Sequence, residues 1–195
     1  LDDFVGVADA VSLHLAGFTL SAWLQTTSAA PATLLTKPSA AAGDHYSLEV
    51  GSGGSPGARG HVRGEASATT SAVPADFPIG DGEWHHLAFA RDPVSQVLAL
   101  YIDGNLQPTV EDQSRGAAGT TGDLLLGADP GATGFFRGAL DEVRIYGYPR
   151  IAEHIALEAR GFTLIYQAGE HGHLAGLLEQ HVAAGGSGTA VTAIA

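Results

Sequence analysis

The sequence predicts an all-β protein, an antiparallel sandwich of two sheets. Apolar and polar residues alternate with a period of two in several short segments, and Gly and Pro separate these segments. The turn Asp103-Gly104-Asn105 follows an apolar run directly, which is typical of a β-hairpin because glycine adopts a positive φ without strain. With 195 residues, of which 45% are hydrophobic, the chain is long enough to bury one core.

Each predicted strand has its own pattern. In residues 18–25, Phe18, Leu20 and Leu24 alternate with polar residues, and in residues 84–91, Leu87 and Phe89 share one face. Further strands are predicted at residues 1–7, 46–50, 97–102, 123–127 and 140–146, of which 97–102 is apolar on both faces. Two segments rich in Gly, Ser and Ala, 51–64 and 111–122, are predicted as long loops at the rims of the sandwich.

Two helices and a tail complete the prediction. Ile151, Ile155 and Leu157 lie at near-helical spacing, which indicates a short helix near 150–160 that packs on the sheets. Beyond Arg160 the composition changes, so we divide the chain into a domain at 1–160 and a C-terminal extension at 161–195. The extension is predicted to hold a strand at 162–166, a short amphipathic helix, a Gly-rich hinge at 185–188 and a β-prone arm at 189–195. The predicted helix rests on a stripe formed by Leu174, Leu177, Leu178 and Val182.

Composition excludes several functions. Lys and Arg number 9 against 21 Asp and Glu, for a net charge of -12, and no basic cluster is present to bind nucleic acid. The chain has no Cys, so disulfides and thiol chemistry are excluded. No apolar run approaches the roughly 20 residues of a membrane span. No signal peptide opens the chain, and because it starts at Leu1 inside a predicted strand, we expect it to be processed or cut from something longer.

Five sequence motifs, in order, resemble the laminin G-like, concanavalin A-like jelly-roll domains. The motifs are Leu1-Asp2-Asp3-Phe4-Val5, Gly17 to Trp23, Gly82 to Ala88, Leu100 to Gly104 and Phe136 to Tyr146. The resemblance covers about residues 1–160 and implies two curved antiparallel sheets in a protein that is extracellular or lies on a cell surface or virion exterior. It leaves the ligand open, because one fold carries many functions.

The resemblance also implies a metal site. Related domains hold one structural calcium with an acid near the first strand and another near the Asp-Glu pair of the last motif, which nominates Asp3 and Asp141. The alternative is that Asp141 caps a turn and that Asp3 is solvated. Jelly-roll glycosidases carry a Glu-x-Asp-x-Glu strand, which is absent here, so we do not expect an enzyme.

Aromatic residues on the polar-alternating faces are the candidate ligand contacts. Trp23 and Tyr101 lie opposite the most apolar faces of their strands, and His86 lies on the same face as Trp84. Exposed, such rings would stack on sugars. The alternative is that this face is covered by loops, by the helix near 150–160 or by the C-terminal extension.

Two functions compete at this stage. The first is a non-catalytic extracellular recognition or adhesion module that binds a glycan or a surface protein. The second is a structural subunit of a virion, filament or surface layer that self-assembles through residues 161–195, because a β-prone arm suits strand addition to a neighbour. No nucleic acid and no membrane insertion are expected.

Overall fold

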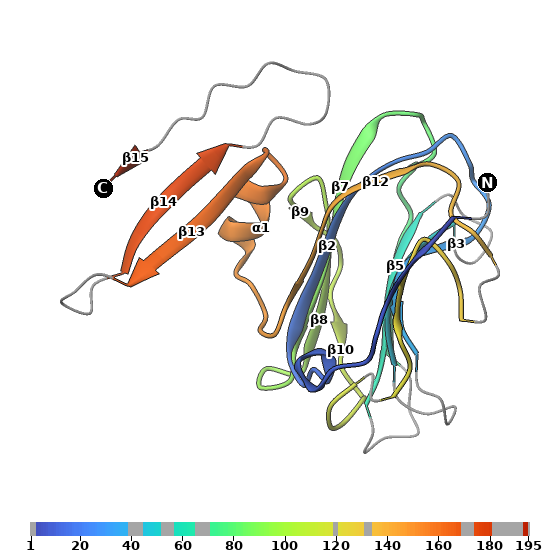
Figure 1. Ribbon diagram of the computed structural model, residues 1–195, viewed down its shortest axis with the longest axis horizontal. Helices are drawn as coiled ribbons and strands as arrows, with labels where there is room; N and C mark the ends of the chain where they lie inside the picture. The colour runs from blue at the N-terminus through green and yellow to red at the C-terminus, as the bar shows by residue number, and fades with distance from the viewer. Residues whose placement is uncertain are drawn as a thin grey trace.

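The computed structural model is an antiparallel jelly-roll sandwich with one short helix, which confirms the predicted fold class (Figure 1). It describes residues 3–38, 45–51, 57–64, 71–118, 121–130, 134–168, 174–180 and 193–194. Within these ranges no helix is long and apolar enough to cross a membrane.

The first sheet, sheet A, has six strands, of which β1 and β6 form the edges. In spatial order they are β1 (Val5–Val7), β11 (Leu124–Leu126), β3 (Ala32–Lys37), β4 (His45–Val50), β5 (Ala58–Arg63) and β6 (Ser71–Ala75). Strand β1 is shorter than the predicted 1–7. Strand β5 falls inside the segment 51–64 that was predicted as a loop, so that prediction was wrong.

The second sheet, sheet B, carries the longest strands, and all of its pairings are antiparallel. In spatial order they are β10 (Val110–Glu111), β8 (Val97–Ile102), β7 (Trp84–Asp92), β2 (Phe18–Gln25) and β12 (Ala139–Tyr146), with β9 (Asn105–Leu106) paired to β8. A single turn of 3₁₀ helix, η1 (Val11–Leu13), precedes β2.

The core lies between the two sheets because alternation sends one set of side chains inward from each strand. Leu20 of β2 pairs with Phe89 of β7, which pairs in turn with Leu100 of β8, and all three are fully buried. From sheet A, Tyr46 and Leu48 of β4 meet them; the rings of Phe18 and Tyr46 lie 5.3 Å apart.

Strand β5 crosses this core with a glycine, Gly60, where the ring of Phe89 approaches the backbone. A Cβ at Gly60 would lie 2.2 Å from Cδ2 of Phe89, closer than any real contact. Gly60 is one of the glycines on which the loop prediction for residues 51–64 rested. The close packing of Phe89 against β5 requires it.

The predicted helix near 150–160 is confirmed as α1 (Ala152–Glu158), which covers the outer face of sheet B. Ile155 of α1 is fully buried against Ala88, Ala90, Ala99 and Tyr101. The outer face of β7 and β8, which the sequence predicts to be the more polar one, therefore forms a second, smaller apolar core with α1.

Next to α1 a separate three-stranded antiparallel sheet follows, made of β13 (Phe162–Ala168), β14 (Leu174–Gln180) and β15 (Ala193–Ile194) (Figure 1). The predicted amphipathic helix built on Leu174, Leu177 and Leu178 was wrong, because this segment is β14. Gly176 lowers its helix propensity, and β13 offers a strand to pair with along its whole length. The predicted hinge 185–188, Val182 and residues 189–192 of the arm lie outside the described residues.

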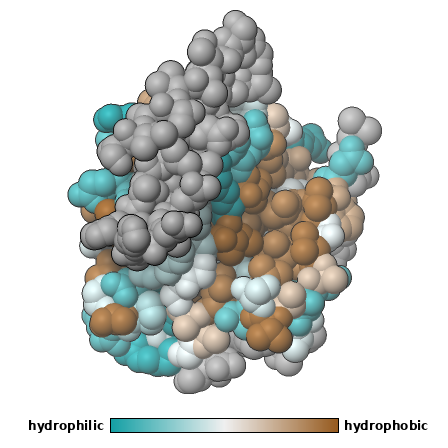
Figure 2. Space-filling model, turned by 60° about the vertical axis from the view of Figure 1, so that its left-hand side comes forward, coloured by the Kyte–Doolittle hydropathy of each residue, from teal (hydrophilic) through white to brown (hydrophobic). Residues whose placement is uncertain are grey.

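Strand β12 ends sheet B with an irregular edge. Its pairing with β2 shifts register between Asp141 and Arg144, and Glu142 takes a positive φ of 51° there. On the side where β12 and β1 end the two sheets, apolar side chains reach the surface, among them Phe4, Val5 and Val7. Figure 2 shows a large apolar area on the face that it presents.

Candidate functional site: a hollow at the rim

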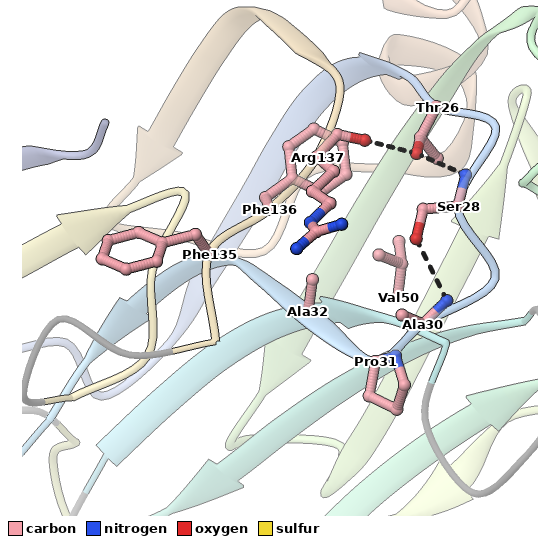
Figure 3. Close-up of a pocket in the computed structure, with 9 residues that line it drawn as sticks. All are labelled: Thr26, Ser28, Ala30, Pro31, Ala32, Val50, Phe135, Phe136 and Arg137. Atoms are coloured by element: carbon pink, nitrogen blue, oxygen red, sulfur yellow. Dashed lines mark hydrogen bonds between the residues drawn. The ribbon is translucent and has the colours of Figure 1, made fainter. Parts of the chain in front are cut away.

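A small hollow, open to solvent, lies at one rim of the sandwich (Figure 3). It forms where the β2–β3 loop, the end of β4 and the connection from β11 to β12 meet. We call it the rim hollow; it is lined by Thr26, Ser28, Ala30, Pro31, Ala32, Val50, Phe135, Phe136 and Arg137.

Two hydroxyl groups shape the β2–β3 loop. The backbone N–H of Ser28 donates to Oγ1 of Thr26 at 3.0 Å, and the N–H of Ala30 donates to Oγ of Ser28 at 3.2 Å. Such bonds to a residue two positions back make consecutive turns, because a Ser or Thr oxygen replaces a backbone acceptor. The loop that forms one wall of the hollow is therefore preorganised by its own sequence.

The opposite wall is fastened to the same threonine. Oγ1 of Thr26, which is buried, donates to the backbone carbonyl of Arg137 at 2.6 Å. Gly138 follows directly, and a Cβ at that position would lie 2.2 Å from the carbonyl oxygen of Gln25. Glycine thus allows the β11–β12 connection to lie against β2, and this close approach fixes the backbone that carries Arg137.

The side chains give the hollow a mixed chemistry. Figure 3 shows the guanidinium of Arg137 extending toward Ala32 and Val50, beside the ring of Phe136. Phe135 points away from the other lining side chains, and its ring lies 6.3 Å from that of Phe4. An apolar floor, one aromatic wall, a hydroxyl and a cation therefore face one open space.

The predicted ligand residues lie elsewhere, on the face of sheet B that α1 covers. The rings of Trp23 and His86 meet edge to face at 5.4 Å, so the structure brings these two together. Tyr101 lies in the apolar cluster under Ile155 and is 7% exposed, and His86 is 1% exposed. A sugar could stack on Tyr101 only if α1 moved away, so ligand binding by this set stays a prediction.

Beneath α1 lies a buried polar cluster, which we call the α1 hub: Glu158, Arg150, Tyr146, His86 and Ser21. Oε1 of Glu158 accepts hydrogen bonds from Arg150 and from the hydroxyl of Tyr146. Its Oε2 lies 4.0 Å from Nε2 of His86, and both ring nitrogens of His86 and Oγ of Ser21 lack hydrogen-bond partners among the described residues.

The α1 hub keeps its histidine neutral. Burial lowers the pKa of His86 to about 4, and the nearby guanidinium groups of Arg144 and Arg150 act in the same direction. Burial also raises the pKa of Tyr146 to about 12, with the carboxylate of Glu158 adding to the shift. The hub joins α1 to the sandwich through a buried charge pair and a neutral imidazole.

The predicted calcium ligands lie on separate elements. Asp3 is exposed just before β1, and Asp141 is exposed in β12, where its Oδ1 accepts a hydrogen bond from the N–H of Glu142 at 2.7 Å. Within the ranges that the structure describes, His, Asp and Glu do not form any group of three suited to a metal ion. Calcium binding through Asp3 and Asp141 stays a prediction.

Sequence reasoning did not single out Thr26, Ser28, Phe136 or Arg137 as functional. Phe136 and Arg137 belong to the motif Phe136 to Tyr146, which the resemblance explains by the fold alone. Thr26 and Ser28 are residue types that are common in turns. The available signal was the run Phe135-Phe136-Arg137, a guanidinium directly after two aromatic residues just before an edge strand.

The two sheets and their antiparallel pairings define a jelly-roll sandwich. The chain belongs to the concanavalin A-like lectin/glucanases superfamily, whose laminin G model matches residues 2–156. No curated protein matches the sequence significantly.

Solved structures agree on the fold. The binding domain of Paraclostridial Mosquitocidal Protein 1 is similar with a TM-score of 0.63 at 10% identity, over 98% of this chain and 56% of that one. Domains LG4-5 of the mouse laminin α1 chain give a TM-score of 0.60 at 12% identity, over 77% of this chain and 40% of that one. The Ruminococcus gnavus IT-sialidase CBM40, bound to α2,3-sialyllactose, gives 0.58 at 15% identity, over 81% and 98%. At these identities the likeness concerns the fold alone, and the chain spans about half of the mosquitocidal binding domain.

Proposed function

We propose that this chain is a non-catalytic extracellular recognition module that binds a glycan in the rim hollow. The observation that carries the proposal is the mixed lining: Phe136 offers a ring face, Ser28 a hydroxyl and Ala32 an apolar floor, all open to solvent. Sugars present alternating apolar and hydroxyl surfaces, which such a combination matches.

The lining of the hollow argues against catalysis. Its nine residues include no carboxylate and no imidazole. Glycoside hydrolysis by the usual routes requires two carboxyl groups flanking the bond, and acid–base chemistry in general requires a group that exchanges protons near neutral pH. The hollow offers binding groups only.

The similar proteins support recognition as the role. The laminin and toxin domains and the CBM40 share this fold, and the CBM40 structure holds α2,3-sialyllactose. An extracellular location fits these likenesses and the family.

The test is a glycan array followed by calorimetry, with a variant that fills the hollow. Ala30 is exposed at its mouth, and Ala30→Trp should weaken binding of any array hit at least tenfold by occupying the space. The matched control is Ala29→Trp, an exposed neighbour outside the lining, which should bind as the wild type does. Absence of any glycan binding at millimolar concentration, or unchanged binding by Ala30→Trp, would reject the proposal.

A second candidate, assembly through the C-terminal extension, is favoured by one observation. Among the described residues, strand β13 pairs on one side only, with β14, and such an edge offers backbone groups to another chain. Light scattering of the full chain over a wide concentration range tests it. A mass that rises with concentration supports self-assembly, and a constant monomer mass excludes it.

A further inference from the structure

The rim hollow contains a cation, Arg137, that is not paired with an acid among the residues that the structure describes. Three buried cations pair with acids: Lys37 with Asp9, Arg91 with Asp112, and Arg150 with Glu158. Arg137 forms no ion pair and no side-chain hydrogen bond with any described residue. Arg137 is exposed in the lining of the hollow, so its guanidinium is accessible to a ligand.

The backbone that carries this guanidinium is held in place by two contacts. The Arg137 carbonyl is held by Thr26 at 2.6 Å, and the next residue, Gly138, lies against the backbone of Gln25. A side chain that starts from a fixed backbone loses less freedom when a ligand immobilises it, and this lowers the cost of binding.

From these observations, and resting on the proposed function, we infer that the ligand of the rim hollow carries a carboxylate, which Arg137 binds. A guanidinium is a planar fork of donors that matches the two oxygens of a carboxylate. Phe136 and the Ser28 hydroxyl then face the ring and hydroxyls of the same sugar. The ligand class is a glycan with an acidic sugar, such as a uronic or sialic acid.

The charge of the whole chain narrows this class further. A surface of net charge -12 repels polyanions, and one guanidinium cannot offset that repulsion along a highly charged chain. The ligand is therefore a glycan with an isolated acidic sugar, rather than a densely sulfated or polyuronic chain.

The test compares three ligands by calorimetry: an acidic oligosaccharide identified on the array, its carboxyl methyl ester and its neutral parent. The wild type should lose about 10- to 100-fold in affinity on esterification, the value of one charge-assisted pair. Arg137→Gln should lose the same factor for the acid and bind the ester as the wild type does. Arg160→Gln is the matched control, because Arg160 is an exposed arginine that lies outside the hollow.

Each outcome has its own meaning. If acid and ester bind equally while Ala30→Trp abolishes both, glycan recognition stands and the carboxylate inference is wrong. Tight binding of a sulfated polysaccharide in place of the isolated acid would also overturn it. If neither ligand binds, the proposed function itself fails. The ester comparison uses the unaltered protein, so it does not depend on how any variant folds.

Discussion

Two adjacent histidines of β7, His85 and His86, point to opposite faces of sheet B and meet opposite surroundings. The ring nitrogens of His85 face two carboxylates, which accept hydrogen bonds from it when it is protonated; Nδ1 lies 2.8 Å from Asp103 and Nε2 lies 3.1 Å from Asp81. Burial opposes its charge, but these carboxylates prevail and raise its pKa. His86 is enclosed beneath α1, where burial and two guanidinium groups lower its pKa to about 4.

We expect an NMR titration to separate the two rings. The His85 C–H resonances should shift at a pH above 6.5, and those of His86 should shift only near pH 4. His85→Gln assigns the signals by removing one titration. Observation of both histidines near the ordinary value of 6.5 would contradict the burial and pairing described for them.

The depressed pKa of His86 also makes stability depend on pH. Between pH 6.5 and 4 the unfolded chain binds a proton that the folded chain refuses, so the free energy of unfolding falls as the pH falls. The loss amounts to about 3 kcal/mol at pH 4. His86→Phe, which keeps a ring, should flatten this slope in urea denaturation measured across the pH range; an unchanged slope would exclude His86 as its source.

Gly60 offers a test of packing at the scale of one atom. Gly60→Ala places a methyl group within 2.2 Å of the Phe89 ring, so it should lower the free energy of unfolding by about 1–3 kcal/mol. Gly6→Ala is the control, because the nearest atoms there lie 3.9 Å away. Equal urea midpoints for the two variants would show that the ring of Phe89 can move aside without a loss in the free energy of unfolding.

At the scale of elements, strands could be predicted where a buried apolar residue recurs at every second position over a long segment. Residues 18–25 and 84–91 show the alternation and form β2 and β7, and residues 97–102, which are apolar on both faces and precede a turn, form β8. Strand β5 was not predicted because Gly60 makes its sequence resemble a loop. This glycine makes room for the ring of Phe89, a contact that the local sequence does not show. The segment 174–180 carries apolar residues at both helical and strand spacing, and its pairing with β13 decided between them.

The attachment of α1 can be tested through its buried acid. Glu158→Gln keeps the shape of the side chain but leaves the Arg150 guanidinium buried without its counter-charge, so we expect a loss of about 3 kcal/mol in the free energy of unfolding. Glu153→Gln, exposed on the same helix, should change it by less than about 0.5 kcal/mol. Equal effects in urea denaturation would show that the hub does not hold α1.

At the scale of the whole molecule, the rim hollow could not be predicted from the sequence. Thr26 and Arg137 meet at 2.6 Å although 111 positions separate them, and no local pattern announces that contact. The resemblance supplied the architecture, because its motifs are those of the strands. It did not supply the ligand residues, because these lie on the connections, where one fold varies its function.

Calcium is the remaining property of the whole molecule to be tested. If Asp3 and Asp141 hold a structural ion, chelation should lower the melting temperature, since an ion bound to the folded state stabilises it by mass action. Asp3→Asn and Asp141→Asn should then melt like the chelated wild type, and Glu83→Gln, an exposed acid elsewhere, should keep the calcium response. A melting temperature indifferent to chelator would remove the proposal.

The irregular edge of β12 has a consequence for how copies of the molecule behave in concentrated solution. A straight, apolar edge strand is a template on which another chain can add, and β12 lies near surface-exposed Phe4 and Val5. The register shift between Asp141 and Arg144, and the left-handed backbone at Glu142, interrupt that template and place charged side chains along it. We therefore expect the bulge to hinder edge-to-edge addition of other chains, and a substitution that straightened β12 to lower the solubility of the protein.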